Sequence, residues 1–159
     1  MAIGPTEREL RLLFVCTGNS ARSQMAEALL NFKGKGRFHA ESAGAQPASG
    51  VNPYAIETLR EHHIPWAGHS PRGLDGLDRE PWDFVITVCD RARQECPVFP
   101  GSSNTLHWGL DDPSEVEGTD AEKLAAFQRT RVELMQRLYP FIELALRARG
   151  AAARSTPVG

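Results

Sequence analysis

The fold of this chain is constrained most by one short segment. It is an apolar run that ends on a cysteine and leads through a polar loop into a helix. The run has the character of a buried, partly β-branched strand and comprises Leu10, Leu12, Leu13, Phe14 and Val15. Residues 17–20 read Thr-Gly-Asn-Ser, which tolerate the unusual backbone angles of a tight loop. Residues 23–30 then form a strong helical stretch. The sequence therefore predicts a strand, a loop and a helix in direct succession.

This unit has the layout of an anion-binding cradle around the thiol of Cys16. Backbone N–H groups in such a loop point inward, and the positive end of the following helix attracts a tetrahedral anion. The same field favours the thiolate, so we expect the pKa of Cys16 to be lowered from its ordinary value. Arg22 would add a planar, two-pronged donor to the anion. The alternative is a buried, inert cysteine at the end of a core strand.

Strands and helices continue to alternate along the rest of the chain. We expect further strands at 37–43, 84–88 and 105–108, and helices at 54–62 and 119–149, with Pro140 bending or interrupting the last helix. Such alternation predicts an α/β fold with one four-stranded parallel sheet and helices on both faces. We expect a single domain at 9–149, between flexible tails at 1–8 and 150–159.

Size and charge exclude several classes of function. The chain has 159 residues, enough for one domain with a real core, and 18 basic against 20 acidic residues give a formal charge of −2. This balance provides no electrostatic basis for binding nucleic acid or a membrane surface. The N-terminal residues lack the pattern of a signal peptide. We therefore expect a cytoplasmic monomer, in which three cysteines indicate redox or nucleophilic chemistry and not disulfide cross-links.

Chemically capable residues follow three of the predicted strands. Cys16, Cys89 and Asp112 each come shortly after a strand, and the carboxyl ends of parallel strands meet at one edge of the sheet, where ligands bind. Asp112 precedes Pro113, which restricts its backbone to extended geometry. Its carboxyl group is a candidate general acid, although capping a loop is the alternative. We expect Asp111 to serve the loop, and His107 and Trp108 to be structural.

Cys89 and Cys96 flank six residues without Gly or Pro. A helical turn or two at this spacing would hold the two cysteines apart, because bridged Cα atoms must lie within about 7 Å. A disulfide between them would then require local unwinding. The alternatives are a metal pair or two unconnected thiols, and the chain lacks the His–Cys cluster that a zinc site needs.

Residues 16–27, Cys-Thr-Gly-Asn-Ser-Ala-Arg-Ser-Gln-Met-Ala-Glu, resemble the nucleophile loop shared by low-molecular-weight tyrosine phosphatases and thioredoxin-coupled arsenate reductases. The phosphatases typically have proline after the Arg-Ser pair, whereas Gln24 and Met25 are similar to the reductases. Segments 42–44, 51–56 and 107–113 also resemble the reductases, and the similarity runs from about residue 10 to about residue 145. The resemblance implies a phosphatase-like fold and a reductase that converts arsenate to arsenite.

The resemblance also implies roles for individual residues. Arsenate, for which phosphate or sulfate are analogues, would bind in an oxyanion loop formed by Thr17, Gly18, Asn19, Ser20, Ala21, Arg22 and Ser23. Cys16 would be the nucleophile and Asp112 the general acid. From the residues themselves we also expect the Ser23 hydroxyl to hydrogen-bond the Cys16 thiolate. Cys89 and Cys96 would act after Cys16 in a disulfide relay that reduced thioredoxin regenerates. No cofactor or metal is expected to be bound.

Some relatives bind potassium beside the loop, through residues that match Asn19, Glu27 and Ser42 plus an acid. This chain carries Arg72 where the acid would fall, so we expect turnover that is insensitive to potassium.

Two alternative functions remain. A low-molecular-weight protein tyrosine phosphatase would share Cys16, Arg22 and Asp112 without needing the other cysteines, but the acidic stretch 114–117 lacks the tyrosines that usually hold its aromatic substrate. The other alternative is a non-catalytic arsenite or metal sensor, which would have no need of the Arg22 and Asp112 pair.

Overall fold

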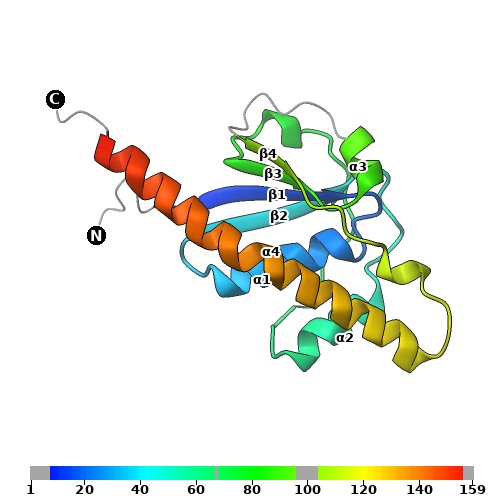
Figure 1. Ribbon diagram of the computed structural model, residues 1–159. Coiled ribbons are helices and arrows are strands. Elements are labelled where there is room, and N and C mark those ends of the chain that lie inside the picture. Colours follow the sequence, from blue (N-terminus) through cyan, green and yellow to red (C-terminus); the bar gives the residue numbers. More distant parts are fainter. Residues whose placement is uncertain (1–7, 67, 96–103, 156–159) are drawn as a thin grey trace.

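A four-stranded parallel sheet with the order β2-β1-β3-β4 lies at the centre of the molecule (Figure 1). The computed structural model describes residues 8–66, 68–95 and 104–155. The strands are β1 (Leu10–Cys16), β2 (Phe38–Gly44), β3 (Phe84–Thr87) and β4 (Asn104–His107). Leu12 of β1 pairs with Ala40 on one side and Phe84 on the other. The predicted α/β class and sheet are confirmed, and each strand begins and ends within a residue of its expected position.

Helices follow the strands in the expected order. They are α1 (Arg22–Lys33), α2 (Pro53–Glu61), α3 (Asp90–Glu95) and α4 (Asp120–Ser155), with short 3₁₀ turns η1 (Leu77–Arg79) and η2 (Pro113–Glu115). The start of α2 shows how local sequence specifies where a helix begins. The Asn52 side chain accepts a hydrogen bond from the Tyr54 N–H, and Pro53 occupies the first helical position, where a missing N–H costs nothing.

The two faces of the sheet are covered differently. On one face α4 crosses beside α1 (Figure 1), and the ring of Phe141 from α4 lies 5.0 Å from Phe84 and 6.2 Å from Phe38 between ring centres. On the other face the Arg11 guanidinium lies 4.5 Å above the ring of the buried Trp82. Right-handed crossovers from β1 to β2 and from β3 to β4 run in opposite directions along the sheet, which places α1 and α3 on opposite faces.

Helix α4 differs from expectation in three ways. It continues to Ser155, so residues 150–155, expected in a flexible tail, are helical, and Pro140 lies inside it without interrupting it. Alanines 151–153 are strong helix formers and extend the helix past Gly150. Val132, expected in the core stripe, has a side chain that is 42% exposed, while Leu134 is fully buried. None of the described helices is long and apolar enough to cross a membrane.

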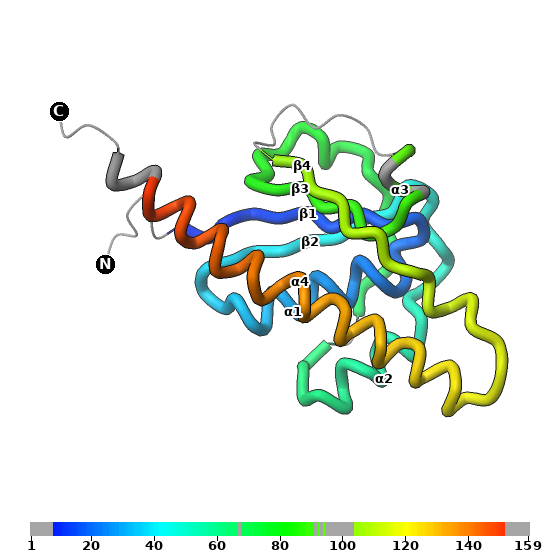
Figure 2. The backbone as a smooth tube through the Cα atoms, in the orientation of Figure 1, coloured from blue at the N-terminus to red at the C-terminus, as the bar shows by residue number. Residues whose placement is uncertain are grey.

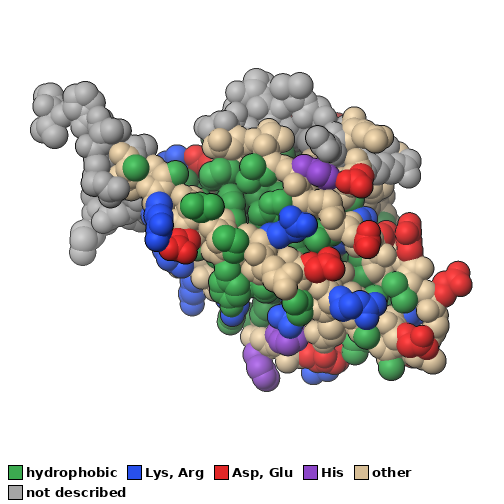
Figure 3. Space-filling view, viewed as in Figure 1, with side chains coloured by type: hydrophobic (Ala, Val, Ile, Leu, Met, Phe, Trp, Pro, Cys, Tyr) green, Lys and Arg blue, Asp and Glu red, His purple; other side chains and the backbone are tan. Residues whose placement is uncertain are grey.

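The carboxyl edge of the sheet and the outer ends of β1 and α4 lie at opposite ends of the molecule. The segments that follow β1, β3 and β4 gather at the carboxyl edge, whereas the start of β1 and the end of α4 meet at the other end (Figure 2), where the Arg149 side chain donates to the Arg8 carbonyl at 2.7 Å. Acidic and basic side chains are interspersed over the face that carries α4 (Figure 3), in keeping with the small net charge. Any anion site must therefore come from local geometry.

Candidate active site

The loop between β1 and α1 folds around the sulfur of Cys16. Asn19 adopts the left-handed conformation, with φ of 53°, and its backbone N–H then donates to the Cys16 sulfur at 3.2 Å. Gly44, at the end of the neighbouring strand β2, supports the loop from behind. A Cβ atom at Gly44 would lie 2.5 Å from the Thr17 carbonyl oxygen and 2.9 Å from the Asn19 nitrogen, so only glycine fits.

The Cys16 thiol is 2% exposed, and its environment contains opposing effects. Burial raises the pKa of Cys16 above its ordinary value, while the hydrogen bonds from Ser23 and Asn19 and the charge of Arg22 act to lower it. The expectation of a lowered pKa for Cys16 is therefore wrong, because loss of hydration on burial outweighs these hydrogen bonds and the charge of Arg22. The expected Ser23 contact is present, with 2.8 Å between its hydroxyl oxygen and the sulfur. Since Ser23 Oγ accepts from the Asn19 amide, its own proton can be directed at the sulfur.

The N-terminus of α1 is open to an anion. Its cap residue, Ala21, has no side chain that could bond the first-turn N–H groups, and the first turn contains no acidic residue. Uncapped N–H groups and the positive helix end together attract negatively charged oxygens. Because this end lies directly beyond the Cys16 loop, an anion bound there would meet the sulfur.

Arg22 and Asp112 lie together across the same site. The Arg22 guanidinium donates to the Leu110 carbonyl at 2.9 Å and approaches Asp112 Oδ2 at 3.5 Å. The other carboxylate oxygen of Asp112 accepts from both the backbone N–H and the hydroxyl of Ser114, at 2.9 and 2.7 Å. Asp112 is predicted from the resemblance as the general acid, with capping of the loop as the alternative, and its two oxygens allow it to do both.

Cys89 is the second buried cysteine at this edge, and it lies next to the loop. Its sulfur is 3.3 Å from the hydroxyl oxygen of Thr17, the residue after Cys16. The same sulfur accepts from the backbone N–H of Ala92 at 3.3 Å, in the first turn of α3. Cys16 and Cys89 are both free thiols. Cys96, the third expected member of the relay, lies outside the described residues.

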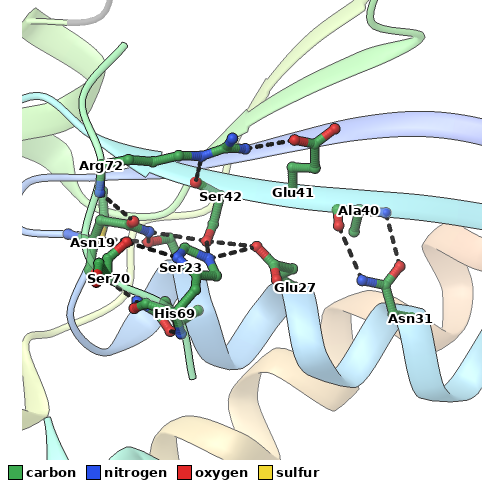
Figure 4. Close-up of polar contacts among 12 residues, drawn as sticks. Asn19, Ser23, Glu27, Asn31, Ala40, Glu41, Ser42, His69, Ser70 and Arg72 are labelled. Carbon is green, nitrogen blue, oxygen red and sulfur yellow. Dashed lines mark hydrogen bonds and ion pairs between the residues drawn. The ribbon is translucent and has the colours of Figure 1, made fainter. Parts of the chain in front are cut away.

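A buried polar chain supports the loop from the β2 side (Figure 4). The Asn19 amide donates to Ser42 Oγ at 2.9 Å, and Ser42 donates to Glu27 at 2.8 Å. His69 Nε2 closes the chain at 3.0 Å from the same Glu27 oxygen. Burial raises the pKa of Glu27, against the lowering effect of its Ser42, His69 and Arg72 neighbours. The role of His69 could not be predicted from the sequence, because no local pattern links it to Glu27, 42 residues earlier in the chain.

The residues matching the potassium site are engaged with protein donors. The Oδ1 atom of Asn19 accepts from the Arg72 backbone N–H at 3.1 Å. The Arg72 side chain donates to the Ser42 carbonyl at 2.9 Å and to Glu41 at 2.7 Å (Figure 4). These residues do not fit a cation, since a guanidinium already supplies positive charge there. Within the described residues, no group of three or more His, Cys, Asp or Glu side chains could hold a metal ion.

Comparison with known proteins supports what this geometry suggests. The family model of low molecular weight phosphotyrosine protein phosphatases matches residues 11–149. The chain belongs to this family. An arsenate reductase from Halalkalibacterium halodurans is 39% identical over 132 residues, which cover 83% of this chain and 94% of the relative.

Two solved structures add to the comparison. The structure described as an arsenate reductase in the phosphate binding state has a TM-score of 0.72 and 28% identity, with coverage of 84% of this chain and 97% of that one. A thioredoxin-dependent arsenate reductase from Corynebacterium glutamicum has a TM-score of 0.65 and 29% identity, with coverage of 86% of this chain and 63% of that one. The low-molecular-weight phosphatase-like fold expected from the resemblance is thereby confirmed.

Proposed function

We propose that this protein reduces arsenate to arsenite, with Cys16 as nucleophile and thioredoxin as the final reductant. The observation that carries the proposal is the meeting, at one sheet edge, of the Cys16 loop, the Arg22–Asp112 pair and a second free thiol, Cys89. Relatives named arsenate reductase support the choice of oxyanion. The reducing cytoplasm is the compartment in which such thiols act.

In the first step the Cys16 thiolate attacks the arsenic of a dihydrogen arsenate ion. A sulfur–arsenic bond forms and an arsenic–oxygen bond breaks, while Asp112 supplies the proton with which the oxygen leaves as water. Arg22 and the N-terminus of α1 hold the remaining oxygens. Bound arsenate would replace Asp112 as the negatively charged partner of the Arg22 guanidinium. The Asp112 carboxyl group would then be free to face the leaving oxygen. Asn19 and Ser23 stabilise the thiolate that burial disfavours.

In the second step the sulfur of Cys89 attacks the sulfur of Cys16. The sulfur–arsenic bond breaks and its electron pair stays on arsenic, which takes up protons and leaves as arsenite. Cys96 then attacks Cys89, which frees the Cys16 thiolate and leaves a Cys89–Cys96 disulfide. Reduced thioredoxin returns the two electrons by thiol–disulfide exchange, and its own dithiol becomes a disulfide.

The test supplies arsenate, thioredoxin, thioredoxin reductase and NADPH to the full chain, and follows NADPH loss and arsenite release. Cys16→Ser should abolish both signals. Cys96→Ser should release about one arsenite per protein molecule and then stop, because the Cys16–Cys89 bridge cannot be passed on. The two variants control for each other, because each replaces one cysteine sulfur by oxygen and so blocks a different stage of the relay.

Sustained thioredoxin-driven turnover by Cys96→Ser would refute the relay. Absence of arsenate-dependent NADPH loss in the unaltered protein would refute the reductase, and would leave the phosphatase or sensor alternatives.

A weak phosphatase activity is also expected, because phosphoryl transfer needs only Cys16, Arg22 and Asp112, and the chain belongs to a phosphatase family. The residues after Pro113 in η2 are Ser114 and Glu115, which offer no aromatic surface to a phosphotyrosine ring. Slow hydrolysis of an artificial aryl phosphate that survives Cys96→Ser but not Cys16→Ser would support this side activity.

A further inference from the structure

The carbonyl oxygens of residues 16–20, at the end of β1 and in the loop after it, all accept hydrogen bonds from the chain around the loop. Backbone N–H groups supply four of the five bonds, at 3.1, 2.8, 2.9 and 2.7 Å, and belong to Ala45, Gln46, Ala48 and Asn52. The Asn19 carbonyl differs, because its donor is a side chain: Gln24 Nε2 lies 2.8 Å from the oxygen. Gln24 thus does for this peptide what backbone donors do for the other four.

The carbonyl bonds determine where the N–H groups of the loop point. In a trans peptide the N–H is directed away from the C=O of the same peptide. The peptide between Gly18 and Asn19 shows the effect, because its carbonyl is bonded from outside and its N–H donates to the Cys16 sulfur at 3.2 Å. By the same geometry, the bond from Gln24 to the Asn19 carbonyl turns the Ser20 N–H toward the inside of the loop.

Gln24 is itself held in one orientation. Its side chain is fully buried in the first turn of α1. Nε2 donates a second hydrogen bond to the His69 carbonyl at 2.7 Å, and Oε1 accepts from the His69 N–H at 3.1 Å. The amide group cannot turn without breaking these bonds, so the donor on the Asn19 carbonyl is rigid. Donors that are oriented before the ligand arrives are what an oxyanion site requires.

We propose that Gln24 is a positioning residue that orients the Asn19–Ser20 peptide, so that the Ser20 N–H binds an oxygen of the tetrahedral anion. The inference deepens the proposed function and rests on it, because the anion in the reaction would be arsenate. Gln24 acts through this one peptide and does not touch the reacting atoms. Without its bond the peptide can rotate and turn the Asn19 carbonyl oxygen, which repels an anion, toward the site.

The test compares the unaltered full chain with Gln24→Met, which keeps the length of the side chain and removes its polar atoms. Isothermal titration calorimetry with inorganic phosphate measures the affinity of the site. We expect about a tenfold loss in Gln24→Met, the size of one hydrogen bond to a charged group. In the coupled assay, KM for arsenate should rise by a similar factor while kcat changes less, since the N–H holds the anion from the moment it binds.

Amide proton resonances separate an effect on this one peptide from a general loosening of the loop. At saturating phosphate, the Ser20 amide proton of the unaltered protein should shift downfield, because it bonds an anion. In Gln24→Met this shift should shrink. The shift of the Gly18 amide proton should persist, since the carbonyl of that peptide is held by the Gln46 N–H.

The matched control is Asn31→Leu, about two turns further along α1. The Asn31 amide brackets the backbone of Ala40 in a similar way, with Nδ2 donating to the carbonyl at 3.0 Å and Oδ1 accepting from the N–H at 2.8 Å (Figure 4). Its loss should lower the midpoint of urea unfolding without changing the affinity for phosphate.

Unchanged phosphate affinity in Gln24→Met, a full Ser20 shift in that variant, or an equal loss of affinity in Asn31→Leu would overturn this inference and leave the proposed reductase intact. If Gln24→Met does not fold, Gln24→Glu takes its place. It keeps the acceptor for the His69 N–H and has no N–H for the Asn19 carbonyl, so the Ser20 shift should again shrink. Phosphate binding with the Ser20 shift but without arsenate reduction would refute the proposed function and not the role of Gln24 in anion binding.

Discussion

At the scale of single residues, the site depends on atoms that approach too closely for any substitute. Gly44 is the clearest case, because the Thr17 carbonyl and Asn19 N–H occupy the space of a side chain. Asn19 then directs its N–H at Cys16. The loop geometry is thus set partly by a residue on the neighbouring strand.

Gly44→Ala should displace the loop that surrounds Cys16. A clash with backbone atoms cannot be relieved by a side-chain rotation, so we expect a loss of about 1–3 kcal/mol in the free energy of unfolding. Arsenate-dependent turnover should fall by more than stability alone would explain, because the Asn19 N–H moves away from the sulfur. Urea denaturation and the coupled NADPH assay measure the two effects.

The matched control is Gly50→Ala, since a Cβ atom at Gly50 meets nothing within 4 Å. Full activity and anion affinity in Gly44→Ala would show that the loop tolerates displacement, contrary to this account.

At the scale of elements, the contacts between β2 and segment 69–72 decide what lies behind the loop. The side chains of Ser42 and Glu27 bond His69, and the Ser42 carbonyl bonds Arg72. We therefore expect turnover to be unchanged when sodium is exchanged for potassium at constant ionic strength. A large rate gain in potassium would mean that a cation displaces these protein donors.

Helix α4 carries a proline in its interior, where the missing N–H and the ring both cost stability. Pro140 is exposed, so we expect Pro140→Ala to stabilise the fold by about 1–2 kcal/mol after allowing for the freer unfolded chain. Urea unfolding should show a higher midpoint with unchanged turnover. Arg137→Ala, an exposed change one turn earlier, should leave the midpoint nearly unaltered.

At the scale of the whole molecule, burial of the Cys16 thiol connects the site to global stability. Its pKa is raised in the folded state, so as pH rises through the value of the unfolded thiol, about 8.5, the unfolded chain loses the proton first. The free energy of unfolding should therefore fall with increasing pH until the folded thiol also ionises.

Cys16→Ser removes this titration, and its stability should fall less steeply above about pH 8.5 than that of the unaltered protein. Urea denaturation of both proteins across the alkaline range gives the comparison. Parallel curves would show that the thiol has the same pKa in both states.

The elements and the position of the site follow from local sequence. The apolar run before Cys16, the Asn52-Pro53 helix start and the run at 84–87 are short-range signals, and parallel topology places the ends of those strands at one edge. The buried face and the length of α4 were harder to predict from the sequence. Packing decided that Leu134 and not Val132 faces the core, and that Pro140 does not end the helix.

Local sequence was enough to predict the fold class, the candidate nucleophile with its loop, and the candidate acid and cysteines, because each is encoded within a few consecutive residues. How these groups are held became visible in the folded chain: burial raises the pKa of Cys16, and the Glu27–His69 hydrogen bond lies behind the loop. Desolvation and these side-chain hydrogen bonds depend on neighbours 15 or more residues apart in the chain, which pattern and spacing do not specify.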